Sequence, residues 1–152
     1  MTSSSGKAPM NTSRALVAGL IGTLFATALW VLEPAFGLPE LAVGQILSHL
    51  IAVVTAYFSP GPVVGWAIHV FVGLTLALTY ARLFVGRLRG APVVRGLMFG
   101  CLIFVMAQLV FTPLVGAGVF SRGDVPMLVG SLLGHLLYGG ILGAVYGLPQ
   151  AA

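Results

Sequence analysis

Long uncharged stretches make up most of the chain, and short links between them carry most of its charged residues. The uncharged stretches cover residues 15–32, 41–58, 63–81, 96–120 and 125–148. A helix that crosses a bilayer takes about 20 apolar residues, with a range of roughly 17–25. All five stretches are therefore long enough to be considered as membrane spans.

The composition settles the class of protein. Hydrophobic residues make up 59% of the 152 residues, charged residues only 7%, and the mean hydropathy is +1.08. A soluble domain carries roughly a quarter charged residues, so this chain is predicted to be an all-α integral membrane protein whose first partner is the lipid bilayer. Its net charge of +4 then describes membrane topology, and we expect no nucleic-acid partner. The single cysteine, Cys101, excludes a disulfide framework and a multi-cysteine zinc site.

The distribution of positive charge predicts how many stretches cross. Lysine and arginine in short loops mark the cytoplasmic side of a membrane protein. Basic residues stand before the first stretch and between the third and fourth: Lys7 and Arg14, then Arg82, Arg87, Arg89 and Arg95. If both groups are cytoplasmic, an even number of crossings separates them. Two of the first three stretches then cross, which predicts four spans with both termini cytoplasmic.

Residues 41–58 are the stretch that we expect not to cross. Polar residues fall near one helical face there (Gln45, Ser48, His49 and Thr55), and prolines bracket the stretch on both sides. This pattern favours an interfacial or re-entrant helix. A fifth span with its polar stripe facing other helices is the alternative.

Two segments repeat one spacing. His69-x3-Gly73-x6-Tyr80 is matched by His135-x3-Gly139-x6-Tyr146. Arginine, proline and glycine spacings around the first and third spans also match, so 14–86 and 95–148 are predicted to be two tandem helix-pair repeats. A rival alignment pairs His135 with His49 and favours five spans. We expect residues 1–13 to be disordered, 14–148 to form one helical bundle, and 149–152 to be a short tail.

The repeated residues have a structural and a chemical interpretation. Small residues at four-residue spacing let helices approach closely, and this predicts a packing role for Gly65, Gly73, Ser131, Gly139 and Gly143. Two histidines on neighbouring helices are also suitable axial ligands for a b-type haem, so His69 and His135 are the candidate haem ligands or buried polar site. The expected cofactor is none, with haem b as the alternative, and metal binding stays open.

A third interpretation is an ion or proton path. Glu33, before Pro34, is the acidic residue nearest to the hydrocarbon, and with His69, His135, Gln108 and Thr112 it would line a polar route. A carboxylate in the outer headgroup zone is the simpler interpretation of Glu33. No catalytic motif appears in the sequence, so we expect no enzyme.

Four short motifs resemble a family of small bacterial membrane proteins known only as a domain of unknown function. They are Gly-Leu-Ile-Gly (19–22), Pro-x2-Gly-Leu-Pro (34–39), Gly-Trp-x-Ile-His (65–69) and Gly-His-x2-Tyr-Gly (134–139). The resemblance implies a four-helix inner-membrane protein and no activity. We therefore expect a non-enzymatic scaffold or accessory subunit that packs a membrane-protein partner, or a second copy, through glycine-rich helix seams. The alternative is a haem-binding or ion-conducting module.

Overall fold

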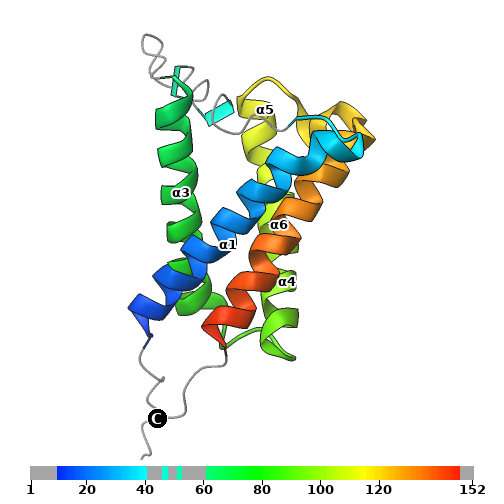
Figure 1. Ribbon diagram of the computed structural model, residues 1–152. Coiled ribbons are helices and arrows are strands. Elements are labelled where there is room, and N and C mark those ends of the chain that lie inside the picture. Colours follow the sequence, from blue (N-terminus) through cyan, green and yellow to red (C-terminus); the bar gives the residue numbers. More distant parts are fainter. Residues whose placement is uncertain (1–9, 41–45, 48–50, 53–60, 148–152) are drawn as a thin grey trace, which may run out of the picture.

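Four long helices form from the stretches that the hydropathy pattern marks, and proline stands in the first turn of three of them. Proline suits this position because the first helical N–H groups have no partner within the helix. The computed structural model describes residues 10–40, 46–47, 51–52 and 61–147. Its elements are α1 (Thr12–Leu32), η1 (Glu33–Phe36), α3 (Pro62–Thr79), η2 (Tyr80–Phe84), α4 (Pro92–Met106), η3 (Ala107–Phe111), α5 (Thr112–Leu114), η4 (Val119–Gly123) and α6 (Val125–Tyr146) (Figure 1).

These elements give four candidate membrane spans. Helical segments long and apolar enough to cross cover Thr12–Phe36, Pro62–Phe84, Pro92–Leu114 and Val125–Tyr146. The prediction of an all-α protein with four such helices is confirmed for the described residues, which contain no strand. The interfacial or re-entrant helix at 41–58, with His49, lies outside the described residues except for 46–47 and 51–52, and stays a prediction.

The first helix begins earlier than the sequence pattern predicts. Asn11 is its N-cap, and the side-chain Oδ1 accepts a hydrogen bond from the backbone N–H of Arg14 at 2.9 Å. A cap of this kind satisfies an N–H group that has no partner in the helix. Met10 packs against the hydrophobic core. Disorder is therefore the wrong prediction for residues 10–13, while residues 1–9 and 148–152 lie outside the described part.

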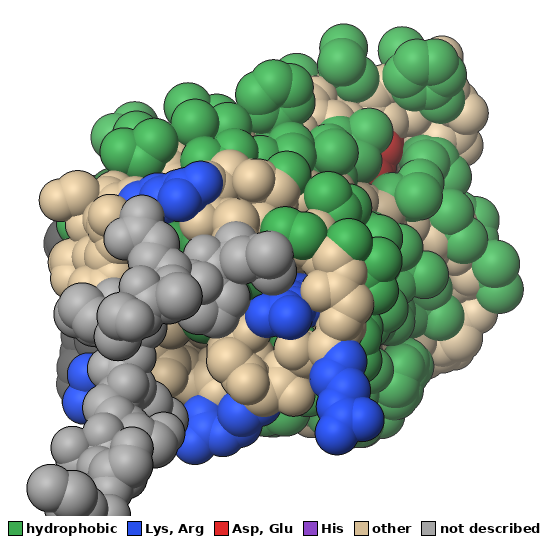
Figure 2. All heavy atoms as spheres, turned by 90° about the horizontal axis from the view of Figure 1, so that it is seen from below, with side chains coloured by type: hydrophobic (Ala, Val, Ile, Leu, Met, Phe, Trp, Pro, Cys, Tyr) green, Lys and Arg blue, Asp and Glu red, His purple; other side chains and the backbone are tan. Residues whose placement is uncertain are grey.

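One end of the bundle is basic. The start of α1 and the end of α6 lie together there (Figure 1), and Arg14 Nε donates a hydrogen bond to the backbone oxygen of Val145 at 2.9 Å. We call this the basic end, and it carries five arginines: Arg14, Arg82, Arg87, Arg89 and Arg95. Figure 2 looks onto this end and shows Lys and Arg side chains spread over it, with hydrophobic side chains on its flanks.

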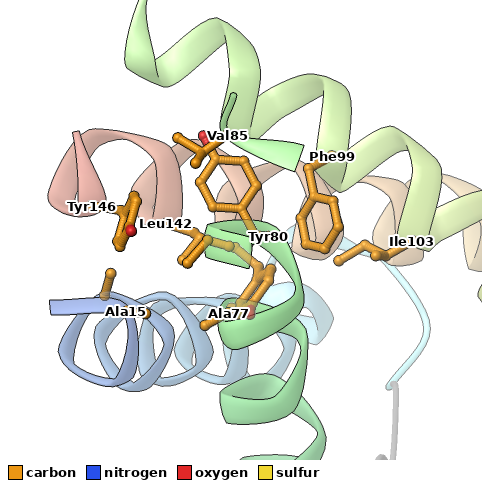
Figure 3. Packing of buried hydrophobic residues seen from close by; sticks show 12 residues of the cluster. Ala15, Ala77, Tyr80, Val85, Phe99, Ile103, Leu142 and Tyr146 are labelled. Atoms are coloured by element: carbon orange, nitrogen blue, oxygen red, sulfur yellow. The ribbon is translucent and has the colours of Figure 1, made fainter. Parts of the chain in front are cut away.

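Aromatic rings form the core near the basic end. The ring of Tyr80 lies between those of Phe99 and Tyr146, with centroid separations of 5.3 Å and 6.1 Å (Figure 3). Tyr80 and Leu142 are fully buried. This cluster joins the end of the second span to α4 and α6.

Among the long helices, α4 packs against α6, α1 packs against α6, and α1 packs against α3. Between α3 and α4 the described residues make no comparable contact, although η2 reaches α4 near the basic end. The second and third spans are therefore joined at one end and separated along the rest of their length.

Candidate functional site

The two predicted histidines lie against the same side chain. His69 projects from α3 and His135 from α6, and the indole of Trp30 on α1 contacts both, with ring centroids 5.3 Å and 5.9 Å away. A second indole, Trp66, lies 5.7 Å from His69, and Phe104 lies 6.0 Å from His135. The two histidines that the sequence predicts for one candidate site therefore share one aromatic neighbour.

The two imidazoles differ in their hydrogen bonds. The Nδ1 atom of His135 lies 2.7 Å from the backbone oxygen of Ser131, one turn earlier in α6. A carbonyl only accepts, so Nδ1 carries the hydrogen and Nε2 of the neutral ring keeps a lone pair. The Nε2 atom of His69 is buried and has no hydrogen-bond partner among the described residues. An unpartnered buried nitrogen is costly, which makes this atom a candidate contact for a ligand.

Both histidines line one cavity of about 710 Å³. Its wall is formed by residues of all four spans, and α3 and α4 face each other across it. Apolar side chains make up most of the half nearer the basic end: Leu76, Phe84, Phe99, Leu102 and Ile103. Most of the polar side chains gather toward the other end, among apolar ones such as Phe111, Val115 and Met127. They are Trp30, His69, Gln108, Thr112, Ser121, Asp124, Ser131 and His135.

A buried amide organises this polar end. Gln108 is 1% exposed, its Nε2 donates to Ser131 Oγ at 3.1 Å, and its Oε1 accepts from Ser121 Oγ at 3.1 Å. It lies in η3, a π turn that continues α4, and such turns are frequent at functional sites. Thr112 Oγ1 donates to the backbone oxygen of Gln108 at 2.8 Å. A hydrogen-bonded chain therefore runs from η4 through Gln108 to Ser131, whose carbonyl holds His135.

Glu33 does not join this group. The residue is 1% exposed, and neither carboxyl oxygen has a hydrogen-bond partner among the described residues. It faces Gly130 of α6, where an added Cβ atom would lie 2.6 Å from Glu33 Oε2. Glu33 is not among the described residues that line the cavity. The structure thus brings His69, His135, Gln108 and Thr112 to one cavity. The fifth predicted path residue, Glu33, lies in η1 against Gly130 of α6.

The predicted packing residues are used within the chain. A Cβ atom added to Gly73 would collide with the Thr23 hydroxyl of α1, and one added to Gly143 would lie 2.9 Å from Gly96 Cα of α4. Gly139 likewise faces the backbone of α4. Gly65 and Ser131 are buried. Three of the five thus pack the protein's own helices together.

The chain was compared with known protein families, curated proteins and solved structures. A family model described as "Family of unknown function (DUF6789)" matches residues 10–151. The chain belongs to this family. No curated protein and no solved structure matches it. The predicted resemblance to a family of unknown function is confirmed, and DUF6789 carries no activity or site residues to transfer.

Three further residues of this DUF6789 chain contribute to the site without having been predicted for it. Trp30 is 8% exposed, and its Nε1 donates to the backbone oxygen of Gly130 at 3.3 Å. Tyr138 Oη donates to the backbone oxygen of Gly73 at 2.6 Å. Ser121 reaches Gln108 from a turn with positive φ at three successive residues. Only Tyr138, three residues after His135, had a helical spacing that indicates a shared face.

Proposed function

We propose that this protein is a non-enzymatic, multi-pass membrane protein that holds a lipophilic molecule in the cavity between α3 and α4. The observation that carries the proposal is the cavity itself, about 710 Å³ with a mostly apolar wall and a few polar groups at one end. Sites for small molecules generally have this composition. In a bilayer such a cavity is reached by molecules that are already dissolved in the lipid.

An accessory role in a larger assembly, or a homo-oligomer, remains part of the proposal but draws no support from the glycines. Gly73, Gly139 and Gly143 face neighbouring helices of the same chain. Glycine contacts of this kind stabilise a bundle because they let two backbones approach. Once used inside the chain, they are not free to bind a partner.

The cavity is tested by filling it. Val72 lines it from α3, whereas Val64 of the same helix is 40% exposed and does not line it. A long-chain alkyl probe with a photoreactive diazirine, added to the protein in nanodiscs, should label lining residues such as Leu102. We expect Val72→Phe to reduce that labelling strongly and Val64→Phe to leave it unchanged. Labelling spread evenly over the lipid-facing surface in all three proteins would overturn the proposal.

A b-type haem is the second candidate, and the two imidazoles on one cavity wall favour it. His135 keeps a lone pair on Nε2, and His69 Nε2 has no partner among the described residues, so each ring retains a nitrogen that suits iron. The indole of Trp30 lies against both rings, and a macrocycle would have to displace it. Protein purified in mild detergent from haem-replete cells should show a Soret band that His69→Ala removes, and a colourless preparation would exclude haem.

We also propose that the basic end is cytoplasmic, in a bacterial inner membrane, and that the two helix pairs are tandem repeats. Five arginines at one end support the orientation, and the contact between Tyr80 and Tyr146 is consistent with equivalent positions. In a Cys101→Ser background, Gly61→Cys should react with an impermeant thiol reagent from outside intact cells. Gly90→Cys should react only after lysis, and the reverse pattern would contradict the orientation.

A further inference from the structure

We infer that the molecule in the cavity is an uncharged amphiphile whose hydroxyl head lies near His69 and His135. Its apolar tail would run toward Phe84 and Phe99. The inference rests on the proposed function and names the chemical class of the ligand. Three properties of the wall carry it: the charges that line it, the hydrogen-bonding groups left open, and the change from polar to apolar lining along its length.

The wall offers no partner for a negatively charged head. None of the described lining residues is lysine or arginine. Arg122 directly follows Ser121, which lines the polar end. Its side chain donates to the backbone oxygen of Gly116 at 3.1 Å. An anionic head needs a cation or several charge-assisted hydrogen bonds to leave water. A phospholipid or a lipid phosphate is therefore disfavoured at this end of the cavity.

A positively charged head has one weak partner. Asp124 is the sole acidic residue among the described lining residues, and it is exposed. Its Oδ1 already accepts a hydrogen bond from the backbone N–H of Met127 at 3.1 Å as the N-cap of α6. An exposed ion pair contributes little. The wall therefore favours a head without charge.

Most polar side chains of the wall already use their donors within the protein. The hydroxyl groups of Thr23, Thr112 and Tyr138 each donate to a backbone oxygen. His69 Nε2 has no partner among the described residues, and His135 Nε2 keeps a lone pair. A hydroxyl group both donates and accepts, so one hydroxyl can satisfy either or both of these atoms. A larger head with many acceptors would find few open donors.

The rest of the wall suits a hydrocarbon tail. From Val72 and Leu76 toward Phe84 on one side, and from Met106 toward Phe99 on the other, the lining is apolar. Thr79 is the polar exception, and its hydroxyl donates to the backbone oxygen of Thr75 at 2.8 Å. The head would thus lie at the end of the cavity away from the basic end, and the tail would point toward the basic end.

The test compares three molecules with related tails: geranylgeraniol, geranylgeranyl phosphate and the headless hydrocarbon phytane. The chain has two tryptophans, and both lie against His69, so tryptophan fluorescence in nanodiscs reports binding. We expect saturable binding of the alcohol, with the phosphate weaker by about 10-fold or more. His69→Phe should lower the affinity for the alcohol by about 2- to 10-fold, the value of one hydrogen bond, and leave phytane unchanged. Thr75→Val, which removes an exposed hydroxyl on α3, is the control and should change nothing.

Each outcome bears on one of the two proposals. Equal or tighter binding of the phosphate would overturn the uncharged head and leave the cavity proposal intact. Absence of saturable binding for all three molecules would overturn the proposed function. Should His69→Phe fail to fold, the unaltered protein can be crosslinked by alcohols with a diazirine beside the hydroxyl or at the tail terminus. The first should label residues within a turn of His69 or His135 and the second residues near Phe99, and the opposite pattern would refute the orientation.

Discussion

The two sides of the helix bundle differ in what lies between their helices. On the α4–α6 side, glycine faces backbone: a Cβ atom added to Gly100 would lie 2.5 Å from the backbone oxygen of His135, and Gly96 faces Gly139 and Gly143 in the same way. On the α3–α4 side, side chains such as Leu76 and Leu102 face each other across a cavity of about 710 Å³. One side is closed by backbone contact, and the other is kept open.

The difference shows where this fold derives its stability and where it leaves room. Apolar helices gain little hydrophobic energy from association in lipid, so close van der Waals contact between backbones has to hold them together. The glycines of α4 and α6 supply that contact. The described residues that line the cavity from α3 and α4 are mostly larger, such as Leu76 and Leu102, and this is the side on which a ligand is proposed to bind.

The largest expected effect comes from replacing a glycine in the contact between α4 and α6. In Gly139→Val the new Cβ atom would lie 2.9 Å from Gly100 Cα and closer still to the backbone oxygen of Gly96. Because both neighbours are backbone, the helices have to separate. We expect a loss of about 3 kcal/mol or more and a Tm lower by roughly 10 °C, measured in detergent.

The matched control places a side chain on a glycine with free space. Gly86 has no heavy atom within 4 Å of the position that a Cβ atom would occupy, so Gly86→Ala should leave the Tm unchanged. A wild-type Tm for Gly139→Val would mean that α4 and α6 do not meet through this glycine, and the contrast between the two sides would fail.

A smaller effect is expected at the polar end of the cavity. Gln108→Leu removes the amide that joins Ser121 and Ser131 and leaves both hydroxyls without this partner. A buried polar group left unpaired costs about 1–3 kcal/mol, so the free energy of unfolding should fall by that amount. Thr112→Val removes only a bond to the same helical span and should cost less. Equal losses for the two variants would show that the Gln108 network does not hold η4 to the bundle.

The four helices could be predicted, and His69 and His135 chosen as candidate site residues, from the sequence because the signals are local or periodic. Uninterrupted apolar stretches identify helices in lipid, since every backbone polar group has to be satisfied within the segment. The His-x3-Gly spacing puts each imidazole and its glycine on one helical face. The predicted tandem repeat would place His69 and His135 at equivalent positions, and both lie against Trp30.

The neighbours of these residues could not be predicted, because they depend on how the helices rotate and where loops turn. The position of Trp30 in the sequence suits an interface anchor and a core residue equally well. Phe120, Ser121 and Arg122 have φ of 45°, 47° and 53°, a conformation that costs L-residues roughly 1–2 kcal/mol each and has no sequence signal here. It is this turn that brings Ser121 to Gln108.

A modest effect is expected at the hydrogen bond that joins α6 to α3. Tyr138→Phe keeps the ring, which lies against Gly22 of α1, and loses the hydrogen bond to the backbone oxygen of Gly73. Hydrogen bonds between membrane helices average about 0.6 kcal/mol. The Tm should fall by about 1–2 °C. The amount of alkyl probe that labels the cavity should also differ from wild type, because α3 has lost a hydrogen bond to α6. Unchanged labelling together with an unchanged Tm would mean that α1 alone positions α3.

The smallest expected effect concerns the other buried polar group at this end of the molecule, Glu33. Gln108 has a partner on both amide atoms, whereas neither carboxyl oxygen of Glu33 has one among the described residues. An ionised carboxylate at 1% exposure would cost several kcal/mol, so we expect the neutral acid, whose shape glutamine reproduces. Glu33→Gln should then change the free energy of unfolding by less than about 0.5 kcal/mol. A loss above about 2 kcal/mol would instead indicate a buried charge that has lost its ion-pair partner. Since no such partner exists among the described residues, that result would direct the search to the segment between the first and second spans.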